Sequence, residues 1–156
     1  NIILKGALAV SLLFVGVFSS SMTIARECVS DYELYSKAQV DAAEYIEKNT
    51  AEKAVFLTGD NHNNAVAALT GRSIVCGADT FLYYHGINTA ERKNEVANMY
   101  ADPVGNKELY KKYNVSYIFV SDVETGEFQI NFEGLGQIAE KVYDAQNVVI
   151  YKCNEL

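Results

Sequence analysis

Side chains capable of chemistry concentrate in one stretch, Asp60–Arg92, which reads DNHNNAVAALTGRSIVCGADTFLYYHGINTAER. It contains both histidines of the protein together with acidic, amide, basic and aromatic residues. Asp, Asn and His side chains hydrogen-bond sugar hydroxyls, accept protons or ligate metal ions. We therefore expect any binding site here, and the candidate ligand-binding residues are Asp60, Asn61, His62, Asn63, Arg72, Tyr84, His85 and Arg92.

The polar run Asp60–Asn63 also has a structural interpretation, because a strand-to-helix turn and a helix N-cap select the same residue types. Asp60-x-His62 with the distant His85 offers too few ligands for a typical metal site. We therefore predict no metal and no cofactor. A small metal-assisted enzyme that uses Asp60, His62 and His85 remains an alternative.

The basic and aromatic candidates have two interpretations each. Arg72 follows a glycine at the start of an expected strand, where it either binds an anion or pairs with Glu91 or Asp60. The aromatic residues of Phe81–Tyr84 offer a platform for a sugar or a prenyl chain, although core packing is their commoner use. His85 beside them is either a ligand-binding group or a packed, hydrogen-bonded residue.

The composition bounds the function. A chain of 156 residues with 49% hydrophobic and 21% charged residues has the composition of one globular domain. From Glu27 onward, 11 basic and 20 acidic residues leave a net charge of −9, which repels nucleic-acid backbones. There is no glycine-rich phosphate loop and no serine in a Gly-x-Ser-x-Gly context, so we assign no catalytic residue.

Three cysteines, Cys28, Cys76 and Cys153, have no metal-type spacing. We interpret them as free and mostly buried thiols. A disulfide between Cys76 and Cys153, linking two strands, is the alternative.

The N-terminal stretch Gly6–Ala25 consists of 20 uncharged residues, with Lys5 before it and Arg26 after it. That length just spans a hydrocarbon core of about 30 Å. We interpret residues 1–26 as a transmembrane helix, the last span of a longer protein, since the chain begins with Asn. A signal peptide is the alternative. Either interpretation places residues 27–156 outside the cytoplasm, which the single Lys5 supports weakly.

Alternating patterns after residue 27 predict an α/β fold. We expect helices over 31–48 (capped by Ser30 with Glu33), 64–70, 90–101 (capped by Thr89), 107–113 (capped by Asn106) and, weakly, 135–140. Strands are expected over 54–58, 73–76 and 115–121, a turn over 124–127, and a terminal antiparallel hairpin from 141–144 and 148–152. This order predicts a small three-layer domain with a mainly parallel sheet.

Ligands of parallel sheets bind beyond the carboxyl ends of the strands. The loops after 54–58, 73–76 and 115–121 should therefore meet at one edge. We expect Asp60, His62, His85 and Asp122 to share that rim.

Several short motifs support a resemblance. They are Asn61-His62-Asn63, Leu69–Val75 with Gly77, Tyr83–Ile87, Glu91-Arg92, Met99-Tyr100 and Leu109–Ile118. Together they resemble the C-terminal extracytoplasmic domain of bacterial multi-spanning membrane proteins of the GT-C glycosyltransferase type, which use polyprenyl-phosphate sugars. The resemblance covers roughly residues 58–118, and His62, Arg72, His85 and Arg92 are the family-like positions.

The resemblance implies that the catalytic acidic residue lies in an earlier loop between membrane helices. The present chain would then be a non-catalytic accessory domain that contributes to acceptor or glycan recognition or to stability. Its implied partners are the bilayer, through residues 6–25, the rest of its own polytopic chain, and a glycan or polyprenyl-linked sugar. A stand-alone anchored or secreted binding module is the alternative.

Overall fold

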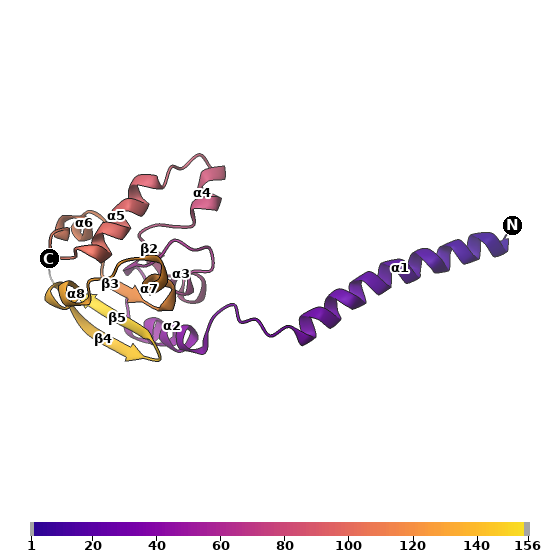
Figure 1. The fold of residues 1–156 in the computed structure, drawn as a ribbon, viewed down its shortest axis with the longest axis horizontal. Helices are drawn as coiled ribbons and strands as arrows, with labels where there is room; N and C mark the ends of the chain where they lie inside the picture. The colour runs from indigo at the N-terminus through magenta and orange to yellow at the C-terminus, as the bar shows by residue number, and fades with distance from the viewer. Residues whose placement is uncertain (1, 155–156) are drawn as a thin grey trace. The chain divides into compact units, whose positions relative to one another are not determined.

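The computed structural model describes residues 2–154 and divides the chain into two compact units, which meet between Glu33 and Leu34. The first unit consists mainly of helix α1 (Ile2–Val29), and the second contains all other helices and strands (Figure 1).

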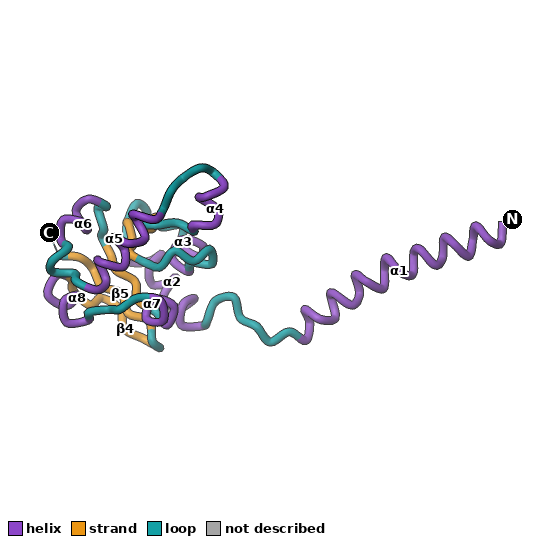
Figure 2. The backbone as a smooth tube through the Cα atoms, turned by 45° about the horizontal axis from the view of Figure 1, so that its top comes forward, coloured by secondary structure: helices purple, strands orange, loops and turns teal. Residues whose placement is uncertain are grey.

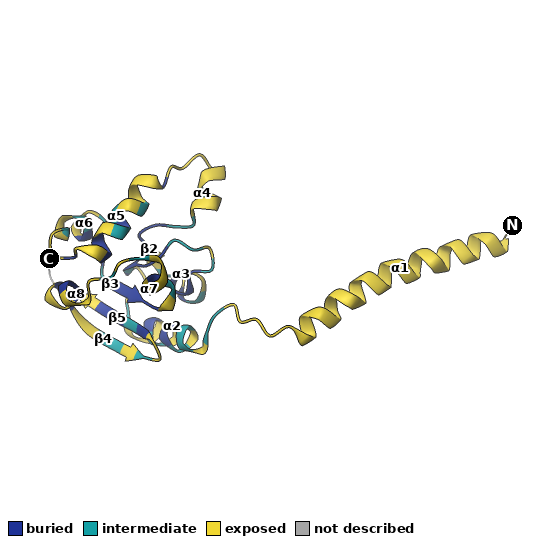
Figure 3. Ribbon diagram, in the orientation of Figure 1, coloured by how far each residue is buried: buried dark blue, intermediate teal, exposed yellow. Residues whose placement is uncertain are grey.

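Helix α1 extends three residues beyond the predicted end at residue 26. Its 28 residues correspond to about 42 Å of helix at 1.5 Å per residue. None of these residues is buried (Figure 3), and the helix is long and apolar enough to cross a membrane. A signal sequence near an N-terminus can also be long and apolar enough to meet this description.

Helix α2 (Lys37–Asn49) begins six residues later than the sequence predicts. The prediction of a capping box at Ser30 is wrong, because the structure forms it at Ser36. Ser36 accepts from the backbone N–H of Gln39, and the Gln39 side chain accepts from the Ser36 N–H. Both serines fit the capping pattern, but residues 31–34, which follow Ser30, are all exposed, whereas the helix that starts after Ser36 buries Ala42, Ala43 and Ile46. Tertiary burial therefore decides between the two starts.

The second unit contains one sheet of five strands in the order β2-β1-β3-β5-β4. The strands are β1 (Val55–Leu57), β2 (Ser73–Ile74), β3 (Tyr117–Val120), β4 (Ala139–Ala145) and β5 (Val148–Cys153). β1 is parallel to both β2 and β3, and β5 is antiparallel to both β3 and β4. Four strands therefore run in one direction, and the chain ends in the predicted antiparallel hairpin.

Alternate residues of the strands bury on opposite faces of the sheet. Phe56, Phe119 and Ile150 join a core with Ile46 of α2 and Val66 of helix α3 (Ala65–Thr70). The neighbouring residues Leu57, Ile118, Val120 and Tyr151 join a second core with side chains from α5 (Ala90–Ala101), α6 (Lys107–Lys112) and α8 (Phe132–Ile138). These side chains are Val96, Met99, Tyr100, Tyr110, Leu135 and Ile138. Helices cover both faces, so the predicted three-layer α/β architecture is confirmed (Figure 2).

The remaining helices are α3 (Ala65–Thr70), α4 (Asp79–Tyr84), α5 (Ala90–Ala101), α6 (Lys107–Lys112), α7 (Asp122–Glu127) and α8 (Phe132–Ile138). The predicted helices near α3, α5, α6 and α8 are confirmed. Neither Thr89 nor Asn106 forms the predicted side-chain cap. Helix α4 was not expected, and the predicted turn over 124–127 is wrong because it belongs to α7.

Helix α7 forms because Ser121 and Glu124 make a capping box at its start. The Ser121 hydroxyl accepts from the N–H of Val123 at 3.2 Å, and the Glu124 carboxylate accepts from the N–H of Ser121 at 3.0 Å.

The order of the strands places the start of α7 at a special point of the sheet. After β1 the chain forms β2 on one side, then returns to form β3 on the other, so the carboxyl ends of β1 and β3 form a topological switch point.

Candidate functional site

The buried carboxylate of Glu124 ties together the loops that follow β1 and β3. Its Oε1 accepts from the N–H of Gly59 at 3.1 Å, and its Oε2 accepts from the Ser121 hydroxyl at 2.5 Å and the Ser121 N–H at 3.0 Å. Glu124 is 2% exposed. Because 65 residues separate Glu124 from Gly59, this contact holds the two sides of the switch point in register.

Tyr100 of α5 fixes the helix over the same two strands. Its hydroxyl lies 2.7 Å from the carbonyl oxygen of Phe119 in β3 and 3.1 Å from that of Leu57 in β1, and donates to both. The side chain is fully buried, and burial raises the pKa of Tyr100 well above its ordinary value. Phe128, which follows α7, stacks on this ring with centroids 5.0 Å apart.

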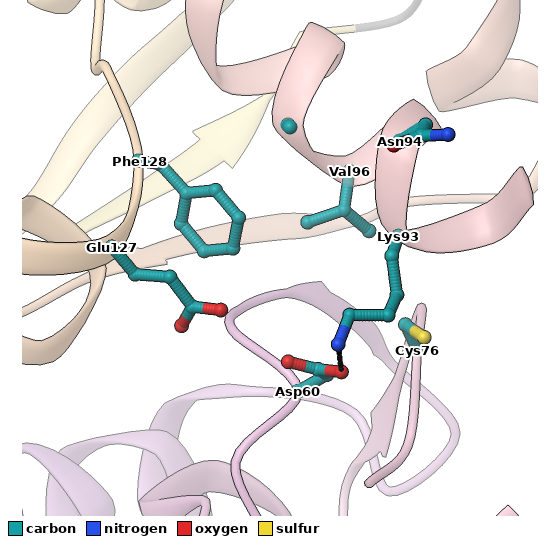
Figure 4. Close-up of a pocket in the computed structure, with 8 residues that line it drawn as sticks. Asp60, Cys76, Lys93, Asn94, Val96, Glu127 and Phe128 are labelled. Carbon is teal, nitrogen blue, oxygen red and sulfur yellow. Dashed lines mark ion pairs between the residues drawn. The ribbon is translucent and has the colours of Figure 1, made fainter. Parts of the chain in front are cut away.

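A cavity of about 230 Å³ lies at the switch point, between the loop after β1, helix α5 and the end of α7 (Figure 4). Its polar walls come from Asp60, Lys93, Asn94 and Glu127, and its remaining walls from Cys76, Val96, Ala97 and Phe128. Polar groups that converge on a partly apolar cavity are typical of small-molecule sites.

Asp60 and Lys93 form an ion pair within this cavity. The Lys93 Nζ lies 2.9 Å from Oδ2 of Asp60, and the Asp60 side chain is only 12% exposed. The hydrogen bond to Asp60 raises the pKa of Lys93. Since Lys93 lies on the first turns of α5, the pair also connects that helix to the end of β1.

Glu127 brings a second carboxyl group toward Asp60. Burial of this group raises the pKa of Glu127, and the negative charge of Asp60 raises it further, whereas Lys93 lowers it. A Cβ at Gly59 would lie 3.0 Å from Oε2 of Glu127, so the close approach of α7 to this loop favours glycine there. The cavity thus holds two neighbouring carboxyl groups and one ammonium group.

Of the predicted polar run, only Asp60 lines the cavity. Asn61 and Asn63 are partly buried in the loop, and His62 is exposed, with its ring edge-on to Phe81 at 6.0 Å between centroids. The N-cap of α3 is the next residue, Asn64, which accepts from the N–H of Ala67 at 3.1 Å.

Arg72 lies elsewhere, at the amino-terminal end of β2. Its predicted pairing with Glu91 or Asp60 is wrong. The guanidinium donates to the carbonyl oxygens of Glu47, Thr50 and Thr70 and to the Thr50 hydroxyl, at 3.0–3.3 Å. Cations favour the carboxyl ends of helices, and two of these carbonyls are at the end of α2. Arg72 therefore has a structural role in this arrangement.

The remaining candidates are on the surface. Tyr84 and His85 are exposed at the end of α4, so the core-packing interpretation of the aromatic residues is wrong. The Arg92 guanidinium lies 5.2 Å from the centre of the Tyr113 ring, and its Nη1 lies 3.4 Å from the Val75 carbonyl oxygen. The structure brings none of these side chains into the cavity with Asp60.

All three cysteines are free thiols, so the alternative disulfide between Cys76 and Cys153 is wrong. Cys28 is exposed, whereas burial raises the pKa of both Cys76 and Cys153. Within residues 2–154, no three His, Cys, Asp or Glu side chains gather as metal ligands would. The hypothesis of a metal enzyme built on Asp60, His62 and His85 therefore has no ligand cluster to support it.

Of the eight residues that line the cavity, the sequence candidates include only Asp60, and the polar residues that they lack are Lys93, Asn94 and Glu127. The sequence does contain a signal for the α7 side of the cavity. Ser121-x-x-Glu124 is a capping-box pattern, which predicts a helix start directly after the strand expected over 115–121. That helix would have placed Glu127 and Phe128 near the carboxyl edge of the sheet. Nothing in the local pattern of 90–101 distinguishes Lys93 from the other polar residues of that helix.

No family model matches the chain, and no curated protein matches its sequence. The fold is similar to the crystal structure of the C-terminal globular domain of an oligosaccharyltransferase from Archaeoglobus fulgidus, with a TM-score of 0.54 and 10% identity. The similarity covers 77% of this chain and 99% of that domain, and at this identity it establishes a shared fold.

Proposed function

We propose that the second unit is a non-catalytic accessory domain of a GT-C-type, glycosyltransferase-like membrane protein. In this proposal α1 spans the membrane, the domain lies on the extracytoplasmic side, and its partners include the rest of its own polytopic chain. The observation that carries the proposal is the fold shared with a domain of an oligosaccharyltransferase, in a chain that also has an apolar helix of membrane-spanning length. The sequence motifs independently resemble the same class of sugar-transferring proteins.

The chemistry of the cavity supports a role in recognising a glycan or another hydroxylated acceptor. Carboxylates accept hydrogen bonds from hydroxyl groups, the Asn94 amide both donates and accepts, and the Lys93 ammonium donates. Phe128 and Val96 add apolar surface, against which the C–H face of a sugar ring can pack. We therefore place the recognition site at Asp60, Lys93, Asn94 and Glu127 rather than at the exposed histidines.

The topology is tested with the native cysteine just after the apolar run. Cys28 is exposed, and a membrane-impermeant maleimide applied to intact cells should label it if the domain is extracytoplasmic. Cys28→Ser is the control for labelling elsewhere. Labelling only after the cells are broken open would contradict the proposed orientation.

Recognition is tested in the intact gene product, reconstituted in lipid nanodiscs. Lys93→Met removes the ammonium group from the cavity, and Lys48→Met removes the lysine of an exposed ion pair on α2 as a matched control. We expect Lys93→Met to weaken retention on immobilised glycans, or transfer from a polyprenyl-phosphate sugar, by about tenfold, which is the loss of one charge-assisted hydrogen bond. Equal behaviour of the two variants would remove the cavity from the proposal.

The second candidate function is a secreted binding module. It is favoured by one observation, since a signal sequence near the N-terminus would have the same apolar helix as α1. Amino-terminal sequencing of the mature protein separates the two candidates. A chain that starts after residue 25 would support secretion, and one that retains α1 would support the membrane anchor.

A further inference from the structure

Helix α4 and the turn after it carry four large apolar side chains that the rest of the unit does not cover. Phe81 is 58% exposed, Tyr83 73%, Tyr84 81% and Ile87 51%. The segment stands away from the sheet in both views of the backbone (Figures 1 and 2), and it is exposed except at the half-buried Leu82 (Figure 3). We call residues 80–88 the α4 tip.

Specific contacts hold the α4 tip in this conformation. The buried Thr89 hydroxyl donates to the Asp79 carboxylate, and this hydrogen bond joins the two residues that flank the α4 tip. The N–H of Ile87 donates to the carbonyl oxygen of Leu82 at 3.0 Å, and Gly86 has the left-handed φ of 73° that this turn requires. The aromatic residues are therefore presented outward on a closed turn.

The chemistry of the α4 tip is that of a membrane interface. Its sequence, TFLYYHGIN, contains no Asp, Glu, Lys or Arg, although the second unit as a whole is strongly acidic. Tyrosine combines an apolar ring with a polar hydroxyl, and such residues concentrate where hydrocarbon meets water. Phe81 and Ile87 supply apolar surface that can enter the outer acyl region.

The tether makes a bilayer the available partner. Only residues 30–36 separate α1 from α2, and seven extended residues reach at most about 25 Å. A domain held within that distance of a membrane meets the membrane surface at a high effective concentration, so even a weak contact is populated. We propose that the α4 tip inserts Tyr83, Tyr84 and their apolar neighbours into the headgroup region of the membrane that α1 spans. This inference rests on the membrane anchor of the proposed function.

The experiment uses the fluorescence of an introduced tryptophan. The natural protein contains no tryptophan, so the signal comes from the introduced position alone. Tyr84→Trp places a single reporter on the α4 tip, and Phe132→Trp places one at an exposed aromatic position of α8. The full chain is reconstituted in phosphatidylcholine vesicles, with or without brominated acyl chains that quench a nearby indole. Flotation of the vesicles first shows whether the chain is anchored.

We expect Tyr84→Trp to show a blue-shifted emission and to lose fluorescence in brominated vesicles, while Phe132→Trp remains unshifted and unquenched. An anchored chain with equal emission and quenching at both positions would overturn the proposal. A blue shift without bromolipid quenching would also overturn it and would indicate a protein surface as the partner of the tip. A chain that does not float with the vesicles would overturn both the anchor and this inference.

Discussion

Replacement of Glu124 tests whether its carboxylate holds the switch point together. Two backbone N–H groups, from Gly59 and Ser121, point at different oxygens of this buried group. In Glu124→Gln the side chain offers one oxygen and one NH₂ group. Either orientation of the amide therefore leaves one buried backbone N–H facing another donor, although the Ser121 hydroxyl can rotate to adapt.

The expected loss of stability follows from the number of backbone N–H groups left without an acceptor. One buried donor without an acceptor costs about 1–3 kcal/mol, so Glu124→Gln should lower the free energy of unfolding by about 2 kcal/mol. Glu124→Ala removes every acceptor and leaves a cavity, and it should cost about 3–5 kcal/mol. Asp122→Asn, at an exposed residue of the same helix, is the control and should change stability by a few tenths of a kcal/mol at most.

Urea unfolding followed by tyrosine fluorescence measures these differences in detergent. All 11 tyrosines lie after α1, so the signal reports on the second unit and not on the apolar helix. Hydrogen exchange at the Gly59 amide adds a local readout and should accelerate in both Glu124 variants. Unchanged stability of Glu124→Gln, with Gly59 exchange as slow as in the natural protein, would refute the assigned hydrogen bonds.

Three further predictions concern single side chains. Tyr100→Phe removes the hydroxyl that bridges two strand carbonyls and should cost about 1–2 kcal/mol in the same urea assay; no loss would contradict the bridge. Because the pKa of Glu127 is raised in the folded protein from its ordinary 4.5, its ionisation opposes folding as pH rises through and above that value. Glu127→Gln should therefore match the stability of the natural protein below pH 4.5 and exceed it at pH 7, by only a few tenths of a kcal/mol because the carboxyl group is partly buried and solvent still screens it; equal stability at both pH values would contradict the raised pKa. Burial raises the pKa of Cys153 to about 12, so a maleimide at pH 8 should modify Cys28 rapidly and Cys153 only on unfolding, as mass spectrometry of the peptides would show; equal rates would contradict the burial of Cys153.

Local patterns determined much of the fold. The β-branched and aromatic run at 115–121 predicted β3, and the pattern at 90–101 predicted helix α5, which buries Val96, Met99 and Tyr100. The helix predicted over 64–70 ends as α3 does, because Gly71 supplies the left-handed conformation of the C-cap, with φ of 65°. These features depend on interactions between residues a few positions apart, so they can be predicted from the sequence alone.

The candidate site was predicted only in part. Asp60 was expected at the carboxyl edge of the sheet and lies there, whereas Arg72 was grouped with it and lies at the other end of its strand. Proximity of the two in sequence misled the prediction, because a parallel strand carries its first and last residues to opposite edges of the sheet.

The sequence by itself therefore determined the α/β class, the apolar helix and the acidic character of the rest of the chain. Only the tertiary structure decided which polar residues share a cavity, because Asp60, Lys93 and Glu127 come from three elements whose positions depend on long-range contacts. Two of these contacts are the hydrogen bond that the Gly59 N–H donates to Glu124 and the hydrogen bonding of the Tyr100 hydroxyl to two strand carbonyls. Tertiary burial likewise selected Ser36 over Ser30 as the start of α2, since both satisfy the local capping rule but residues 31–34, which follow Ser30, are exposed.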